Sequence, residues 1–148
     1  MPATIAGYYL DELVDWTRLI GFYNREIIEF GNKLAEVIRR NTIPNIAAKV
    51  EAQQGRLNAV VASFNRLHQN IKKQNKKLTF DHELIDNRSI DEETEKRQSE
   101  LRQKMEEAEK LYVDVKYACY HFLSESLKKQ KGLGGSPHLH QYLSTKSK

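Results

Sequence analysis

The sequence predicts an all-α protein built as three long antiparallel helices in an elongated up-down-up bundle. Apolar residues recur with alternating steps of three and four along three stretches, a pattern typical of helices packed lengthwise against one another. Only 3 Pro and 7 Gly occur among 148 residues, so little interrupts those stretches. No stretch shows strand alternation of useful length. Dimerisation of such a chain would also complete a larger bundle.

The first helix is expected over residues 8–40. Its seam, the row of apolar positions that faces the neighbouring helices, consists of Tyr9, Leu13, Trp16, Ile20, Tyr23, Ile27, Phe30, Leu34 and Val37. We expect Trp16 to be buried there. Leu19, Ile28 and Ile38 lie beside the seam and predict a stripe wide enough to touch two neighbours.

The second helix is expected over residues 46–77. Pro44 suits the first turn of this helix, which could be capped by Asn41, Thr42 or Asn45. The turn between the first and second helices is short, so the two helices should run antiparallel. The seam is Ile46, Val50, Gln53, Leu57, Val60, Phe64, Leu67, Ile71, Gln74 and Leu78. A polar residue in a seam usually fixes register, which is our interpretation of Gln53 and Gln74.

The third helix follows an irregular connection over residues 79–87, in which we expect one helical turn around residues 81–85. Ser89 and Glu92 have the spacing of a capping box, which predicts the helix start. The seam is Leu101, Met105, Ala108, Tyr112, Val115, Cys119, Phe122 and Ser126. Gly132 suits a helix C-cap. Residues 1–131 therefore form the predicted bundle, and residues 132–148, poor in apolar side chains, a flexible tail.

Composition and termini limit the cellular setting. The mean hydropathy is −0.70, and no apolar run approaches the roughly 18 residues that a membrane span needs. The N-terminus lacks the features of a secretory signal. Cys119 is the single cysteine and is expected to act as a small buried apolar residue. We expect a cytoplasmic protein that has no membrane association.

Positive charge is concentrated on the second helix. Residues 41–78 carry seven basic residues and one acidic residue, and the densest part is Lys72, Lys73, Lys76 and Lys77. Such a run suits a nucleic-acid or anionic surface. Antiparallel packing also places it beside the acidic start of the third helix, residues 91–100, and cross-helix charge matching is the preferred explanation. No aromatic residue lies between the lysines, which argues against nucleic acid.

Candidate metal ligands and contact residues lie on the third helix. His121 and Glu125 are four residues apart, a spacing close to that of di-metal bundles, but no helix carries a Glu-x-x-His pair. They are weak metal candidates, and no cofactor is expected. Tyr117 and Tyr120 lie off the predicted seam and are candidates for a partner surface.

Catalytic motifs are absent from the sequence: it has no Gly-rich loop before a helix, no Gly-x-Ser-x-Gly and no Cys-x-x-Cys. We therefore expect a protein that is not an enzyme. The leading interpretation is a non-catalytic helical interaction or scaffolding module that binds a protein partner or itself. The alternative is a ligand- or metal-binding bundle with a site near His121 and Glu125.

A set of residues in the first two helices also carries a resemblance. The set is Asp15, Trp16, Phe22, Tyr23, Glu26, Ile27, Phe30, Leu34, Glu36, Val37, Asn41, Thr42, Val50, Glu51 and Gln54. It resembles short bacterial helical-bundle proteins of about this length, and the resemblance implies a fold without an activity. The tryptophan in a long first helix is also similar to spectrin-type three-helix repeats, again at the level of fold.

Overall fold

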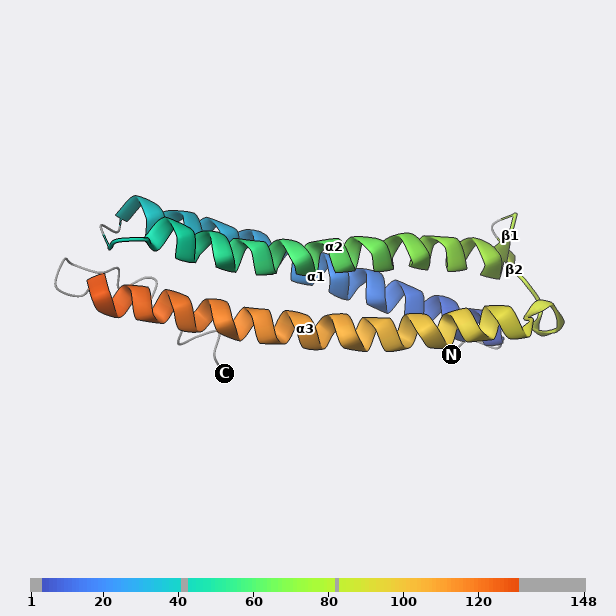
Figure 1. The fold of residues 1–148 in the computed structure, drawn as a ribbon. Coiled ribbons are helices and arrows are strands. Elements are labelled where there is room, and N and C mark those ends of the chain that lie inside the picture. The colour runs from blue at the N-terminus through green and yellow to red at the C-terminus, as the bar shows by residue number, and fades with distance from the viewer. Residues whose placement is uncertain (1–3, 41–42, 82, 131–148) are drawn as a thin grey trace. The chain divides into compact units, whose positions relative to one another are not determined.

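The computed structural model describes residues 4–40, 43–81 and 83–130, with side chains through Ser126. Its three long helices are α1 (Ile5–Arg40), α2 (Ile46–Leu78) and α3 (Glu92–Gln130) (Figure 1). Between α2 and α3 lie strands β1 (Thr79–Phe80) and β2 (Glu83–Leu84) and the 3₁₀ turn η1 (Asn87–Ser89). The predicted all-α fold of three packed helices is confirmed. Gly132 and the predicted tail lie outside the described residues.

The helices contribute to two compact units. Unit 1 consists of Met1–Arg25 and Val60–Lys110, and unit 2 of Glu26–Ala59 and Leu111–Lys148. Each contains a part of every long helix. No helix in the described part of the chain combines the length and apolar character needed to cross a membrane.

Contacts in unit 1 show the up-down-up order. Gln98 of α3 lies against Tyr9 of α1, and farther along both helices Tyr23 contacts Glu109, so α1 and α3 run parallel. The Tyr23 ring stacks on Phe64, whereas Gln74 reaches the first turns of α3, so α2 runs antiparallel to both. The predicted antiparallel arrangement of consecutive helices is confirmed in this unit.

Local hydrogen bonds set the starts of α1 and α2. Thr4 Oγ1 accepts from the Gly7 amide at 3.0 Å, so α1 begins at Ile5, earlier than expected. Asn45 has a φ of 62°, the left-handed conformation that asparagine tolerates, and its carbonyl accepts from the Lys49 amide. Asn41 and Thr42, the other two candidate caps, lie outside the described residues.

The predicted capping box of α3 is wrong by two residues. The Asp91 carboxylate, not the Ser89 hydroxyl, caps the helix by accepting from the Thr94 amide at 2.8 Å. Ser89 instead belongs to η1, where its amide donates to Asp86 Oδ1. The cap hydrogen bonds from Thr94, followed by the charges of Lys77 and Arg97, hold the pKa of Asp91 below its usual value.

The connection before η1 also differs from expectation. Thr79 pairs with Leu84 and Phe80 with Glu83 in an antiparallel ladder, so the helical turn predicted around residues 81–85 is wrong. Asp81 has a φ of 50°, a turn conformation that aspartate tolerates better than most residues. Local turn chemistry of this kind gives no periodic signal.

The first seam forms the core along most of its length: seven of its nine residues are buried, and Tyr9 and Tyr23 are half-buried. The exposed fraction of Trp16 is 9%, which confirms its predicted burial. The predicted wide stripe is wrong, because Leu19, Ile28 and Ile38 are exposed. In unit 2 a polar contact lies beside the seam of α1, where the buried carboxylate of Glu26 contacts Tyr112 of α3.

The second seam is buried from Ile46 to Leu78, with Gln53 half-buried. The third seam departs from prediction near its end, where Tyr120 and Leu123 are buried and Phe122 is half-buried. The Tyr120 ring packs edge-on against Phe30 of α1, with ring centroids 5.1 Å apart. This contact draws Tyr120 into the core of unit 2.

Candidate functional site

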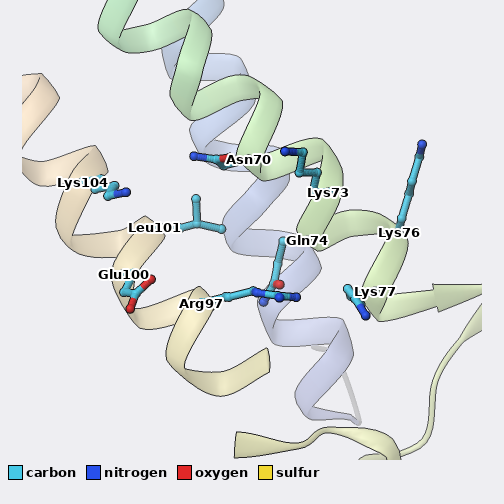
Figure 2. A pocket seen from close by; sticks show the side chains of 9 residues that line it. All are labelled: Asn70, Lys73, Gln74, Lys76, Lys77, Arg97, Glu100, Leu101 and Lys104. Carbon is cyan, nitrogen blue, oxygen red and sulfur yellow. The ribbon is translucent and has the colours of Figure 1, made fainter. Parts of the chain in front are cut away.

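Facing sides of α2 and α3 in unit 1 enclose a groove of about 750 Å³ (Figure 2). We call it the basic groove. It is lined by Asn70, Lys73, Gln74, Lys76 and Lys77 of α2, and by Arg97, Glu100, Leu101 and Lys104 of α3.

Helical spacing brings these side chains together. Lys73, Lys76 and Lys77 stand at positions i, i+3 and i+4 of α2, so they share one face. Arg97, Glu100 and Lys104 share the facing side of α3 in the same way. In the described part of the chain, five cations therefore surround the groove, against one carboxylate, that of Glu100.

The predicted match between the lysine run and the acidic start of α3 is only partly present. Lys77 lies close enough to Asp91 to contribute to its lowered pKa, after the larger effect of the hydrogen bonds from Thr94. Among the described residues, no salt bridge joins the other three lysines of the run to α3. Arg97 pairs with Glu93 of its own helix. Counting charge by segment did not reveal that most of the lysine run lacks an acidic partner on α3, because such a count does not say which face of α3 each charge occupies.

Lys72 stands apart from the other lysines of the run. It is exposed but does not line the groove, because one residue along a helix turns the side chain by about 100°. The predicted surface of four lysines therefore divides into three groove residues and one residue on another face. Sequence reasoning missed the contributions of Arg97, Lys104 and Gln74; pairing the helical faces of α2 and α3 in antiparallel register would have indicated them.

Gln74, which forms the floor of the groove, belongs to a largely buried polar layer. Gln74 is only 2% exposed, and its Nε2 donates to the Thr94 carbonyl at 2.9 Å and to Gln98 Oε1 at 3.1 Å. Gln98 Nε2 in turn donates to the Tyr9 carbonyl at 3.1 Å and to Glu12 Oε1 at 3.0 Å. The layer therefore joins all three helices of unit 1, as a register-fixing role for Gln74 requires.

Glu12 ends this layer as a carboxylate. Partial burial raises its pKa, but hydrogen bonds from Arg102 and Gln98 and the charge of Arg102 outweigh burial and hold the pKa below its usual value. Arg102 Nε and Nη2 donate to the two carboxylate oxygens at 2.8 and 2.7 Å. Glu12 is therefore ionised at neutral pH and accepts hydrogen bonds only.

A second, smaller groove of about 300 Å³ lies in unit 2. His121 and Glu125, the predicted metal candidates, line it together with Lys49 and Arg56. Within the described ranges, no group of three or more His, Cys, Asp or Glu side chains is placed to hold a metal ion. The two candidates thus gain no further ligand there, and cations occupy part of the lining.

Cys119 lies next to this groove as a buried thiol. Burial raises its pKa to about 11, with a smaller opposing effect from Arg56. Its Sγ lies 3.7 Å from Gln53 Oε1. The thiol is therefore protonated at neutral pH and buried, as the sequence predicted.

The two tyrosines predicted as a partner surface are placed differently. The Tyr117 side chain is 57% exposed, whereas Tyr120 is 8% exposed. Placing Tyr120 off the seam was wrong, because its ring fills the space beside Phe30. Tyr117 alone of the pair is available at the surface of unit 2.

Comparisons with protein-family models, curated proteins and solved structures gave no match. The resemblance to short bacterial helical-bundle proteins therefore stays a prediction.

Proposed function

We propose that this chain is a non-catalytic interaction module whose basic groove binds an acidic segment of a partner protein. One observation carries the proposal: five cationic side chains and one carboxylate surround a groove of about 750 Å³. A volume of this order is typical of sites that hold a small ligand or a short stretch of chain.

Charge complementarity identifies the class of partner. Cations held close together on facing helices repel one another and attract a chain that carries several carboxylates. The leucine on the groove lining, Leu101, and the methylene stems of the lysines add apolar contact area to the same surface. An acidic segment would therefore gain from both charge and burial.

Two other occupants fit less well. Residues 131–148 of this chain contain Lys131, Lys146 and Lys148 but no Asp or Glu, so their charge is not complementary to the groove. Single-stranded nucleic acid gains much of its affinity from stacking on aromatic rings, and no aromatic side chain among the described residues lines the groove. A partner protein is the occupant that these observations favour.

The proposal includes a cytoplasmic setting, which the single, buried and free Cys119 supports, because unpaired cysteines are typical of reducing compartments.

Self-association is a separate outcome of the test. Light scattering of the intact chain detects it, and a dimer that the groove substitutions dissociate would make a second copy the occupant and overturn the proposal of a separate partner.

Binding of a fluorescent Glu- and Asp-rich peptide, followed by anisotropy, tests the proposal. The groove variant Lys73→Glu with Lys104→Glu should lose about tenfold in affinity, since two attractive pairs become repulsive. The control variant Lys72→Glu with Lys110→Glu changes the net charge equally at exposed positions of the same helices that lie outside the groove. It should retain most of the affinity.

Salt and nucleic acid complete the experiment. Peptide affinity should fall between about 0.01 M and about 0.15 M salt, because the contacts are exposed charges. Equal losses in the groove and control variants would show binding to net charge alone and would contradict the proposal. Tighter binding of a single-stranded oligonucleotide of equal charge would contradict it as well.

A further inference from the structure

Two acceptors on α1 fix the orientation of every amide in the polar layer of unit 1. The Tyr9 carbonyl and the ionised Glu12 carboxylate cannot donate, so Gln98 must present Nε2 to them. Its Oε1 then faces α2. Gln74 must in turn present Nε2 to Gln98 Oε1 and to the Thr94 carbonyl, which also only accepts.

These hydrogen bonds leave one acceptor atom of the layer without a donor. Gln74 Oε1 is buried and has no hydrogen-bond partner among the described residues. Rotating the Gln74 amide by 180° would place its Oε1 against two acceptors, the Thr94 carbonyl and Gln98 Oε1. The neighbouring hydrogen bonds therefore exclude the rotated orientation. A buried acceptor without a donor is unfavourable, and such groups are rare in folded proteins.

The position of the unpaired atom connects it with the groove. Gln74 lines the basic groove, reaching from α2 toward α3 at its floor (Figure 2). Lys77 and Arg97, which also line the groove, are exposed, so carboxylates of an occupant can draw these two side chains aside as they pair with them. The groove therefore combines cationic walls with a floor that requires a donor.

We infer that Gln74 makes the groove selective for peptide segments that place an amide N–H on its Oε1 while their carboxylates contact the surrounding cations. This inference rests on the proposed function and names the chemistry of its ligand. A peptide backbone offers N–H donors between its acidic side chains. Polyanions such as polyphosphate carry oxygen acceptors only, and those would meet the Gln74 oxygen unfavourably.

A matched pair of probes tests the selectivity on the unmodified protein. The first probe is the acidic peptide, and the second is a depsipeptide of the same side chains in which ester oxygens replace the backbone N–H groups. The depsipeptide should bind about fivefold more weakly, the effect of losing one net hydrogen bond. Charge and shape are closely similar in the two probes.

Two glutamine variants locate the effect. Gln74→Met removes the acceptor at similar volume, and the peptide and the depsipeptide should then bind equally. Gln53→Met is the control, since Gln53 is the other seam glutamine of α2, belongs to unit 2 and does not line the basic groove. Gln53→Met should keep the fivefold difference. Circular dichroism checks that each variant folds.

The outcomes separate this inference from the proposed function. Equal affinity of both probes for the unmodified protein would overturn the role of Gln74 and leave acidic-segment binding intact. Failure of both probes to bind would overturn the proposed function itself. Retention of the fivefold difference in folded Gln74→Met would also contradict the inference, and the comparison on the unmodified protein decides the matter if that variant does not fold.

Discussion

The Tyr112 hydroxyl of α3 donates a 2.7 Å hydrogen bond to Glu26 of α1 within unit 2. Both residues are buried, and Lys116 Nζ lies 3.3 Å from the same carboxylate oxygen. A buried carboxylate is tolerated only where donors and an opposite charge compensate it. This contact thus ties α1 to α3 through groups that would be costly to separate.

Tyr112→Phe should lower the free energy of unfolding by about 1–3 kcal/mol, because it takes one donor from a buried carboxylate and keeps the ring. Urea titration followed by circular dichroism measures the change. Tyr117→Phe, on the same helix and exposed, is the control and should change stability by less than about 0.5 kcal/mol. Equal effects of the two substitutions would refute the role of the Glu26 contact.

Trp16→Ala should cost about 3–5 kcal/mol, since the side chain is almost fully buried in the first seam. Chemical denaturation gives the value, with Leu19→Ala as control on an exposed position of the same helix. The control should be nearly neutral. A loss below about 1 kcal/mol for Trp16→Ala would show that the ring contributes little to the core.

Asp91 rather than Ser89 should control the start of α3. Asp91→Ala should lower the melting temperature, because it removes the acceptor for the Thr94 amide, whereas Ser89→Ala should have little effect. Differential scanning calorimetry compares the two. The reverse order would restore the capping box that the sequence predicted.

The same carboxylate gives a pH dependence of known sign. Its pKa is lowered on folding, so its contribution is complete above the unfolded pKa of about 3.9 and is lost as pH falls through the folded pKa. Asp91→Asn keeps a cap but does not titrate. The stability difference between unmodified protein and Asp91→Asn should therefore narrow as the pH falls below about 4, and a difference that grows would contradict the assignment.

Charge reversal at Lys73 should stabilise unit 1 slightly. Lys73 faces a wall that contains two cations, Arg97 and Lys104, and one carboxylate, Glu100. Lys73→Glu should therefore raise the free energy of unfolding by about 0.2–1 kcal/mol, and less at high salt. Lys72→Glu gains the same kind of i, i+4 pair along α2 but lies outside the groove. Lys73→Glu gains one further pair along α2, with Lys76 three residues on, so Lys72→Glu controls for only part of the effect within α2. A larger gain from Lys72→Glu would still argue against repulsion across the groove.

The features predicted well are those that repeat along a helix. The seam through Leu13, Trp16 and Ile20 is buried because a long row of apolar side chains has one favourable solution, packing against other helices. The fate of Tyr120 could not be predicted in this way. Its burial depends on the space beside Phe30, which belongs to another helix and appears only when the helices are assembled.

The site was predicted only in part for the same reason. The lysine run is visible in the sequence, but whether it faces acid or base depends on the rotation of α3 about its axis. Gln74 was correctly placed in the seam. That its oxygen lacks a partner follows from a chain of hydrogen bonds ending at Tyr9 and Glu12, which no local pattern encodes.

Chemical-shift mapping by NMR tests most directly whether the basic groove is the binding site. The isotopically labelled chain is titrated with the acidic peptide, and amide shifts of the two grooves are compared. If the basic groove is the binding site, shifts concentrate at Asn70, Gln74 and Leu101, while the amide signals of His121 and Phe122 in the smaller groove stay unchanged. Shifts that concentrate at His121 and Phe122, or that spread evenly over all exposed lysines, would contradict this assignment.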